Sequence, residues 1–376
     1  MSRIADLIAD LCPEGVKFKA LRDCTVRNIG GGTPSRGRSD YWNGAIPWAS
    51  VGDISACDLR LRTTRQTITQ MGLDNSSSHL IPAGYIVVAV KINPGAMRIV
   101  ERDVAINQDL RGLQLRDELD PYFLSYYFKT INLVGNGTIV KGITNTKLGQ
   151  VRIPVPPLEV QHEIVRILDK FNILGVQLEA ELEARQRQYE YYRRVLIGTG
   201  DDVRTVGLGE MVSQLSSGRC KSRQSEGQYP VFGSTGEIGR TDDAAHSGDA
   251  LLVARVGANA GRVNHVSGSY DVSDNTLIIR PTDDWDVRFA FHQLSLMNLN
   301  QYAVGGGQPL VTGKLLKSLT VHLPPLEEQH RTAKILDMIH ALVNDRAAGL
   351  PAELLARRKQ YEHYRDKLLT FRELPA

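Results

Sequence analysis

The feature that most constrains this chain is a seven-residue segment that occurs twice. Residues 156–162 are PPLEVQH, and residues 324–330 are PPLEEQH, 168 positions later. Each copy follows a glycine-rich segment with strand-like apolar runs and begins a long helical pattern. This period is far longer than that of a solenoid repeat. The sequence therefore predicts a duplicated unit in which a globular domain is followed by a long helix.

The two long helices are predicted at residues 154–200 and 322–376. Apolar residues at helical spacing form one stripe along each of them, and charged residues occupy the other faces, as in helices that pack along one seam. About 40 residues would form a rod of roughly 60 Å. Because a rod with one apolar stripe needs a partner, we expect the two helices to pair with each other.

The two helices match at two different offsets. Residues 335–337 repeat 167–169 at an offset of 168, whereas segments within 356–365 repeat segments within 184–193 at an offset of 172. The difference of four residues predicts one additional helical turn near residues 344–347, and a whole turn keeps the apolar stripe on the same face. An antiparallel pair would then hold the two globular domains at opposite ends.

The globular domains are predicted at residues 1–153, which include an N-terminal lead-in, and at residues 201–321. Apolar runs such as residues 86–90 indicate buried strands. The first domain is longer by roughly a loop at residues 41–54, which has no clear counterpart in the second. The predicted fold is of the α/β class: two similar domains of mixed α+β structure, separated by two long helices in an antiparallel coiled coil with a pseudo-two-fold internal repeat.

Further matches relate the two domains in detail. Residues 248–255 match the segment that ends at Lys91 at an offset of 164, which makes Arg255 the predicted counterpart of Lys91. Residues 272–275 lie 168 positions after residues 104–107. Both matches indicate strands at equivalent places in the two domains.

Composition excludes several classes of protein. The net charge of +3 and the pI of about 8.6 permit nucleic-acid binding without requiring it. The cysteines Cys12, Cys24, Cys57 and Cys220 form no C-x-x-C pair, which favours reduced thiols over a disulfide frame or a zinc site. Residues 1–11 are amphipathic and acidic, unlike a signal peptide, and no apolar run approaches the roughly 18 residues of a membrane span. We expect a soluble, cytoplasmic protein.

The usual signatures of catalysis are absent or incomplete. Residues 307–314 resemble a phosphate loop, but five residues separate the glycines and Leu315 replaces the hydroxyl that binds Mg²⁺. Residues 93–96 differ from the Asn-Pro-Pro-aromatic motif of amino-methyltransferases after the proline. No Glu-x-Lys nuclease motif or Gly-x-Ser-x-Gly elbow occurs. His162 and His330 are interpreted as structural residues at helix starts. We predict no catalytic residue, metal ligand or cofactor in this chain.

The remaining chemistry is that of binding. Arginine and lysine can contact phosphates or guanine edges, and asparagine can contact adenine. Both domains carry such side chains on glycine-rich loops, and two sets held at a fixed separation suit a bipartite DNA site. The candidate DNA-binding residues are Thr33, Ser35, Arg36, Arg38, Trp48, Lys91, Arg98, Lys141 and Lys147 in the first domain, and Arg219, Lys221, Arg223, Arg255, Asn259, Arg262 and Lys314 in the second.

Over its full length the chain resembles a known family, the specificity (S) subunits of type I restriction-modification systems. The resemblance rests on the two PPLE-x-QH segments, on the paired Gln-Tyr-Glu-x-Tyr-Arg helix ends and on residues 41–48, YWNGAIPW. Residues 229–236 and 255–261 look like the equivalents in the second domain.

The resemblance implies that each domain is a target recognition domain for one half of a bipartite double-stranded DNA site. The coiled coil would set the spacing and dock two methyltransferase (M) subunits, which use S-adenosylmethionine to methylate adenine. Restriction (R) subunits, which hydrolyse ATP with Mg²⁺, would join that core, and the S subunit itself would be non-catalytic. The candidate spacer and docking residues are Leu158, Gln161, Leu168, Tyr189, Tyr192, Leu326, Gln329, Leu336, Tyr361 and Tyr364.

Other functions remain open at this point. One is a scaffold whose terminal domains bind protein and whose helices serve as a spacer. A second is the specificity subunit of a related system that only methylates DNA. A third is a single-chain enzyme with its own methylation or cleavage domain, for which the two halves leave no room in the chain.

Overall fold

The computed structural model describes residues 2–56, 59–131, 133, 142–198, 203–220, 224–305, 308–345 and 347–375. They form two compact units. The first unit comprises residues 1–176 and 356–376, and the second comprises residues 177–355. Each unit therefore contains one globular head, part of the long helix that follows it in the chain and part of the other long helix.

The first head contains eleven strands among its described residues. They are β1 (Phe18–Ala20), β2 (Thr25–Gly30), β3 (Trp42–Ala49), β4 (Arg60–Leu61), β5 (Gln66–Ile68), β6 (His79–Ile81), β7 (Ile86–Ala89), β8 (Met97–Val100), β9 (Val104–Ile106), β10 (Leu110–Leu115) and β11 (Arg152–Pro154). Its helices are α1 (Ser2–Leu11), α2 (Val51–Ala56), α3 (Gln70–Asp74), α4 (Pro121–Phe128) and α5 (Asn145–Gly149), with short 3-10 helices η1 (Leu21–Cys24) and η2 (Ser39–Tyr41).

The second head contains ten strands among its described residues. They are β12 (Arg204–Gly207), β13 (Val212–Ser217), β14 (Tyr229–Gly233), β15 (Gly236–Thr241), β16 (His246–Ser247), β17 (Ala250–Ala254), β18 (Val263–Val266), β19 (Ser269–Val272), β20 (Thr276–Pro281) and β21 (Thr320–Leu323). Its helices are α7 (Val287–Leu296) and α8 (Gly313–Lys317), with the 3-10 helices η3 (Leu208–Met211), η4 (Gly257–Asn259) and η5 (Leu299–Tyr302).

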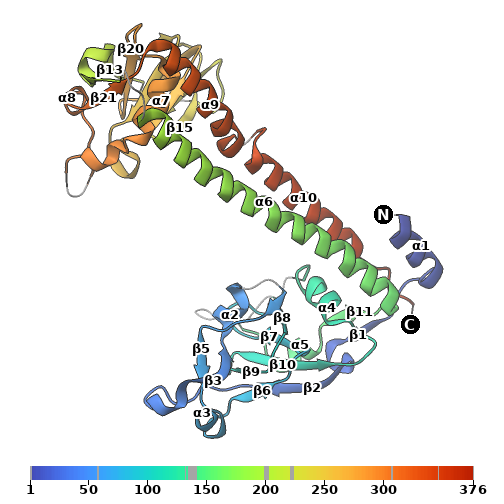
Figure 1. The fold of residues 1–376 in the computed structure, drawn as a ribbon. Helices are drawn as coiled ribbons and strands as arrows, with labels where there is room; N and C mark the ends of the chain where they lie inside the picture. The colour runs from blue at the N-terminus through green and yellow to red at the C-terminus, as the bar shows by residue number, and fades with distance from the viewer. Residues whose placement is uncertain are drawn as a thin grey trace. The chain divides into compact units, whose positions relative to one another are not determined.

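Figure 1 draws both heads as ribbons. Apart from the edge strand β4 of the first head, their sheets have the same strand orders. The order β2-β10-β7-β8 of the first head corresponds to β13-β20-β17-β18 of the second, and β5-β3-β9-β6 corresponds to β15-β14-β19-β16. The pair β1-β11 corresponds to β12-β21. In both heads one pair within the smaller sheet is parallel, β3 with β9 and β14 with β19. The predicted duplication of a mixed α+β domain is confirmed.

The central strands explain the continuous apolar runs in the sequence. Successive residues of a strand point to opposite faces of the sheet. Ile86 and Val88 belong to the core that includes α4, whereas Val87 and Ala89 belong to a second core shared with Ile106 of the other sheet. Because β7 is buried on both faces, every position in it is apolar, and each buried valine or isoleucine contributes about 1.5–3 kcal/mol.

Two of the predicted correspondences between the heads are wrong in register. The backbone N–H groups of Val90 and Arg255 make the equivalent bond, to the carbonyl of the residue before β10 or β20. Arg255 therefore corresponds to Val90, and the position of Lys91 corresponds to Val256. A shift of one residue turns a strand side chain to the opposite face. Runs of similar apolar residues do not reveal such a shift, because each register fits almost equally well.

The second register difference lies in β9 and β19. The N–H of Asn107 donates to Ala49 O at 3.0 Å, and the N–H of Ser273 donates to Phe232 O at 2.8 Å. Asn107 therefore corresponds to Ser273, so residues 104–107 correspond to residues 270–273 and not to residues 272–275. The prediction for residues 41–54 is wrong for β3, which has the place of β14. It holds for α2, which begins at Val51 and has no counterpart among the described helices of the second head.

The first long helix, α6 (Leu158–Gly198), is continuous over 41 residues. The second is divided into α9 (Leu326–Asn344) and α10 (Leu350–Leu369), so the prediction of an uninterrupted helix with one additional turn is wrong. The four additional residues belong to the connection between α9 and α10.

Local chemistry accounts for the break. The Asp345 carboxylate accepts hydrogen bonds from the N–H groups of Ala347 at 2.7 Å and Ala348 at 3.2 Å, which competes with continuation of the helix. A Cβ at Gly349 would lie 2.7 Å from three carbonyl oxygens, so only glycine fits there. Pro351 lacks an N–H and is tolerated only in the first turn of a helix, where it stands in α10.

Within each unit the helical segments contact through aromatic rings. In the first unit, Phe171 of α6 stacks on Tyr364 of α10, with 5.5 Å between their ring centroids. The centroid of the Tyr361 ring lies 6.5 Å from that of Phe171. In the second unit, Tyr189 of α6 lies 5.6 Å from His340 of α9. The start of α6 thus contacts the end of α10 and the end of α6 contacts α9, which is the predicted antiparallel order.

The repeated PPLE-x-QH segment anchors each long helix to its head through its glutamine. Gln161 is fully buried, and its Nε2 donates to Pro156 O at 2.7 Å and to Glu118 O at 2.8 Å. Its Oε1 accepts from the N–H of Asp120 at 2.8 Å. All three partners are backbone groups, so the side chain holds the loop before α4 against the start of α6.

Gln329 makes the same three bonds in the second unit. Its Nε2 donates to Pro324 O at 2.8 Å and Asp284 O at 2.9 Å, and its Oε1 accepts from the N–H of Asp286 at 2.9 Å. The side chain of this aspartate caps α7, as that of Asp120 caps α4. The repeated segment is therefore an anchor between helix and head, with matching geometry in both copies.

The histidines of the repeated segment lie beside the same caps. His162 Nε2 is 3.7 Å from Asp120 Oδ2, and His330 Nε2 is 3.5 Å from Asp286 Oδ2. These contacts agree with a structural role for both histidines at the start of the long helices.

A buried polar cluster next to each anchor differs between the units. In the first unit, the Tyr126 hydroxyl donates to Asp169 Oδ1 at 2.5 Å. The equivalent place in the second unit is occupied by His292, whose Nε2 lies 2.7 Å from Asp337 Oδ1 and whose Nδ1 lies 2.9 Å from the Tyr189 hydroxyl. A neutral imidazole satisfies both contacts, because one ring nitrogen donates and the other accepts.

This difference predicts a pH dependence in the second unit. Burial lowers the pKa of His292 from 6.5 to about 4, although Asp337 acts to raise it. Since the unfolded chain binds the proton more tightly, stability is complete above pH 6.5 and falls between pH 6.5 and about 4. We expect His292→Tyr, which introduces the residue of the first unit, to remove about 2–3 kcal/mol of the stability loss between pH 7 and 4.5 in urea unfolding. Equal losses in both proteins would contradict this assignment.

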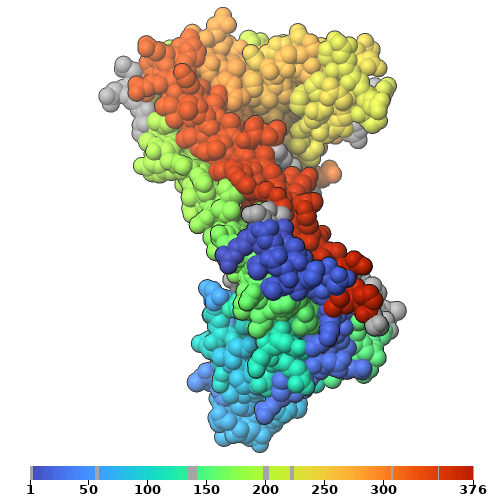
Figure 2. All heavy atoms as spheres, turned by 90° about the vertical axis from the view of Figure 1, so that its right-hand side faces the viewer, coloured from blue at the N-terminus to red at the C-terminus, as the bar shows by residue number. Residues whose placement is uncertain are grey.

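The N-terminal and C-terminal segments of the chain pack against each other in the first unit. The N–H of Val16 donates to Arg372 O at 2.9 Å, and the N–H of Leu374 donates back to Val16 O at 3.0 Å. Ile4 of α1 shares a core with Leu368 and Leu369 at the end of α10. Figure 2 shows α1 in dark blue against the red C-terminal segment.

Candidate nucleic-acid interface

An open pocket of about 630 Å³ lies in the first head, beside the loop that follows β2. Its lining residues are Thr33, Arg36, Trp48, Ser50, Asp53, Arg65, Gln66, Asn107 and Gln108. Three of them, Thr33, Arg36 and Trp48, belong to the predicted DNA-binding set. The pocket is lined mostly by polar and charged side chains, which is typical of a surface that binds a polar ligand.

Glycine allows the loop after β2 to reach the pocket. A Cβ at Gly31 would lie 2.2 Å from Ile106 O, so no other residue fits against β9 here. The second head repeats this constraint at Gly218, where a Cβ would lie 2.3 Å from Val272 O. The close approach carries the chain directly to Thr33, whose hydroxyl donates to the side chain of Gln108 at 2.6 Å.

Arg36 is held in a fixed orientation at the pocket. Its guanidinium lies 4.3 Å from the ring centroid of Trp42 and 5.6 Å from that of Trp48. Both Nη atoms donate to Gln66 Oε1 at 3.2 Å. Trp48 is only 2% exposed, and its Nε1 donates to Gly32 O at 3.1 Å. Trp48 therefore forms the floor that supports the arginine and has little surface with which to contact a base.

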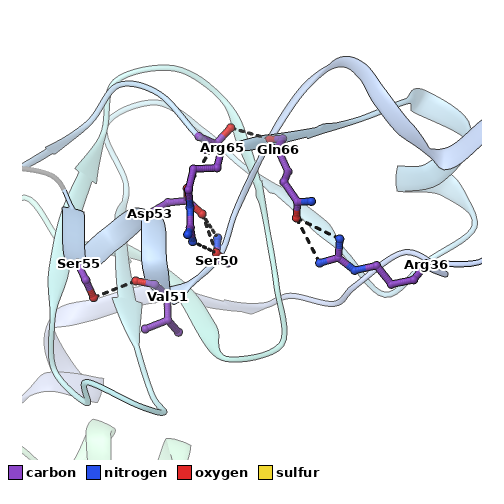
Figure 3. Close-up of polar contacts among 8 residues, drawn as sticks. Arg36, Ser50, Val51, Asp53, Ser55, Arg65 and Gln66 are labelled. Carbon is purple, nitrogen blue, oxygen red and sulfur yellow. Dashed lines mark hydrogen bonds and ion pairs between the residues drawn. The ribbon is translucent and has the colours of Figure 1, made fainter. Parts of the chain in front are cut away.

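A second arginine is neutralised beside the first (Figure 3). The buried Asp53 carboxylate accepts from the backbone N–H and Nε of Arg65, both at 3.0 Å, and from Ser50 N and Oγ at 2.8 and 2.7 Å. Burial alone would raise the pKa of Asp53, but the bonds from Arg65 and Ser50 outweigh it and hold the pKa below its usual value. Arg65 can lie here because residue 52 is glycine, where a Cβ would be 1.9 Å from its Nη2.

The pocket thus combines a stacked arginine with a set of amide groups. Arg36 contributes donors in one plane, and Gln66, Asn107 and Gln108 contribute both donors and acceptors. Arginine held in a plane can make paired hydrogen bonds to a guanine edge or to a phosphate, and amides can pair with adenine. The surface is suited to the polar edges of nucleic-acid bases and to the backbone.

Other predicted residues of the first head lie away from this pocket and have partners of their own. Arg38 forms a bidentate pair with Asp40 at 2.9 and 2.7 Å. Lys91 Nζ lies 2.8 Å from Asp109 Oδ1, and Arg98 donates to the backbone of its own strand. Ser35 is exposed, and its carbonyl accepts from the indole N–H of Trp42 at 3.0 Å. Lys147 is exposed on α5.

In the second head the predicted residues are spread over several elements. Arg255 donates to Ser217 Oγ and Asp274 O, both at 3.3 Å. Asn259 ends η4, and Arg262 lines a different pocket, which lies against the end of α6. Arg219 and Lys314 are exposed. The predicted residues Lys141, Lys221 and Arg223 lie outside the described part of the chain.

Arg65, Gln66 and Gln108 are pocket residues that the sequence interpretation does not include. Neither periodicity nor a local motif distinguishes them. Gln66 reaches the site because β5 pairs with β3, which places it opposite Trp48. The sequence shows a turn-rich stretch here, but only strand pairing identifies which side chains face one another.

The candidate docking residues on the helices divide into two groups. Gln161, Leu168, Tyr189, Gln329 and Leu336 are buried within this chain, so their side chains cannot contact another subunit without unfolding their own surroundings. Tyr361 and Tyr364 pack against Phe171. Leu158, Tyr192 and Leu326 are exposed and are the members of this set that remain accessible to a partner.

The described residues show no metal site and no membrane span. No group of three or more His, Cys, Asp or Glu side chains among them could hold a metal ion. Within the same part of the chain, no helix is long and apolar enough to cross a bilayer.

Fold and site together define a class: a duplicated protein with paired long helices and two similar heads, of which the first presents the polar pocket around Arg36. The model of the type I restriction modification DNA specificity domain matches residues 13–185 and 200–356. The EcoprrI type I restriction enzyme specificity subunit of Escherichia coli is 31% identical over 362 residues, covering 88% of this chain and 90% of that protein. The EcoR124I/EcoR124II specificity subunit of the same species is 34% identical over 187 residues, 44% of this chain and 45% of that protein.

Solved structures agree with this assignment at the level of the fold. The type I restriction-modification S subunit from M. genitalium has a TM-score of 0.63 at 16% identity, and the match covers 94% of this chain and 96% of that chain. The chain therefore belongs to the type I restriction-modification DNA specificity family.

Proposed function

We propose that this chain is the DNA specificity subunit of a type I restriction-modification complex, in which each head recognises one half of a bipartite DNA sequence. The main support is the strand-by-strand duplication of the head in a chain of this family. Two similar domains provide two similar surfaces, as two half-sites require. In the first head the surface is the pocket around Arg36 and Gln66.

The paired helices set the distance between the half-sites and dock two methyltransferase subunits. The apolar side chains that remain exposed on the helices are available for this contact. They include Leu158, Tyr192 and Leu326, together with Val176, which is 65% exposed, and Met338, which is 70% exposed.

The chain is proposed to be non-catalytic by itself. S-adenosylmethionine, ATP and Mg²⁺ would bind to the methyltransferase and restriction subunits, not to this chain.

An exchange of heads tests the proposal. Residues 21–153 would be replaced by the corresponding head of another specificity subunit, and the chain would be expressed with its methyltransferase subunit. Methylome sequencing is expected to show a change in one half of the methylated sequence and none in the other half. The reciprocal exchange of residues 206–320 should alter only the second half. A methylated sequence that survives both exchanges would contradict DNA recognition by the heads.

A further inference from the structure

The two heads differ at one edge of the larger sheet. In the first head, β4 pairs in parallel with β8, with Arg60 opposite Ile99. The N–H of Ile99 donates to Leu59 O at 2.8 Å, and the N–H of Glu101 donates to Leu61 O at 3.3 Å. In the second head, β18 has the place of β8, and no described strand pairs with its outer edge.

The outer edge of β18 carries backbone groups that point away from the sheet. On the inner side, Arg262 O accepts from the N–H of Ala254 at the end of β17, and Gly268 O accepts from the N–H of Gly248 before β17. In an antiparallel pair, bonding to one neighbour involves alternate residues only. Val263, His265 and Ser267 therefore direct their backbone groups outward, at the positions that β4 satisfies in the first head.

This edge opens on the largest of the pockets described, with a volume of about 1320 Å³. Four successive residues of the edge, Arg262 to His265, line it, together with side chains from α6, α7 and α9. The volume exceeds the range of about 300–1,000 Å³ that is typical of small-molecule sites. A cleft of this size along a strand edge suits an extended peptide, whose backbone can continue the sheet.

The charge around the cleft specifies the peptide. Five arginines and two glutamates line it: Arg187, Arg193, Arg194, Arg262, Arg288, Glu183 and Glu190. Arg187 pairs with Glu183, Arg193 with Glu190 and Arg288 with Asp337. The excess positive charge of the lining is therefore that of Arg194 and Arg262. In the first head the edge that receives the added strand carries an acidic residue, Glu101. There the added strand is basic, because Arg60 lies over the ring of Tyr122 at 5.1 Å and pairs with Glu101 at 3.2 Å. The equivalent of Tyr122 in α7 is Arg288, so the complement in the second head is acidic.

We propose that the edge of β18 binds an extended acidic segment of a partner protein by strand addition. The partner's strand would occupy the place that β4 occupies in the first head, with its carboxylates facing Arg194 of α6 and Arg262 beside β18. This inference rests on the proposed function in so far as the chain works in a complex with other subunits. A second copy that paired through the same edge does not fit, because it would bring arginines against arginines.

Fluorescence anisotropy with a defined probe tests the site in the full-length protein. The probe is a fluorescein-labelled peptide of about seven alternating valine and glutamate residues, which spans about 23 Å when extended. Its controls are the valine-lysine peptide and the same acidic peptide N-methylated at alternate residues, which cannot bond to a strand edge. We expect binding of the acidic peptide and at least about tenfold weaker binding of both controls.

Two protein variants test the charge of the cleft and the outer edge of β18 separately. The double variant Arg187→Glu and Arg194→Glu reverses charge in the cleft and should weaken binding at least about tenfold. Ser267→Pro removes one outward N–H without touching the bonds to β17, and should weaken binding of the acidic peptide but leave circular dichroism unchanged. Arg185→Glu lies on the same helix outside the cleft and should bind the peptide as the unmodified protein does.

The outcomes are distinct. Failure of the acidic peptide to bind, or equal binding of the N-methylated peptide, overturns the proposal. Competition by non-cognate duplex DNA, together with a larger loss of DNA binding than of peptide binding in the double variant, would reassign the cleft to the DNA backbone. The head exchange reports the proposed function and the peptide titration reports this surface, so either can fail without the other.

Discussion

Replacing Gln161 with alanine is expected to lower the free energy of unfolding by about 3–5 kcal/mol. The side chain is fully buried and bonds to three backbone groups. Each net hydrogen bond contributes about 1 kcal/mol, and each buried group left without a partner costs a further 1–3 kcal/mol. Water that enters the space would offset part of this cost. Gln329→Ala should have a similar effect in the second unit, because its geometry is the same.

Urea unfolding at pH 7, followed by circular dichroism, measures this effect. The matched control is Gln177→Ala, because Gln177 is an exposed glutamine on the same helix as Gln161. The control should change stability by no more than about 0.5 kcal/mol. If Gln161→Ala and Gln177→Ala unfolded at the same urea concentration, the proline-rich segment would not anchor the helix to the head as the structure indicates.

The second large effect is expected on DNA recognition. Arg36→Ala should weaken binding to the cognate site by about 1–3 kcal/mol, which is about 5–150-fold, and relax discrimination at one position of one half-site. The reason is that Trp42 and Gln66 hold the guanidinium in one plane, which is the geometry that paired hydrogen bonds require. Arg36→Lys should not restore recognition, since an ammonium group has no planar fork.

Competition binding with the reconstituted complex and a panel of single-base variants of its methylated site measures this effect. The matched control is Arg102→Ala, because Arg102 is exposed in a turn of the same head and does not line the pocket. It should leave discrimination unchanged at every position. A uniform loss of affinity with Arg36→Ala, without a change at any one base, would assign Arg36 to a phosphate contact.

Much of the fold follows from local patterns. The proline-rich segments mark the starts of α6 and α9 within a few residues, and the continuous apolar run at residues 86–90 contains β7. The break between α9 and α10 also had a sequence signal in Gly349 and Pro351. The periodicity on either side continues in phase across the break, which is why periodicity alone predicts an additional helical turn there.

The candidate site was less accessible to sequence reasoning. Arg36 follows a glycine-rich turn, which is a recognisable place for a binding residue. Gln66, by contrast, faces Arg36 only because β5 pairs with β3 in one particular register. Likewise, the sequence aligns Lys91 with Arg255, whereas the structure aligns Val90 with Arg255, because apolar strands match in more than one register.

By itself, the sequence determined the duplication, the order of heads and helices, and the family resemblance, because repeats and periodicity are properties of residues near one another in the chain. The tertiary structure decided which side chains meet across the sheets. It also revealed what the repeated glutamines do: Gln161 and Gln329 bond to backbone groups about 43 residues away as well as to the adjacent proline carbonyls. Such contacts depend on the closure of long loops, and no local pattern in the sequence encodes the distance between their ends.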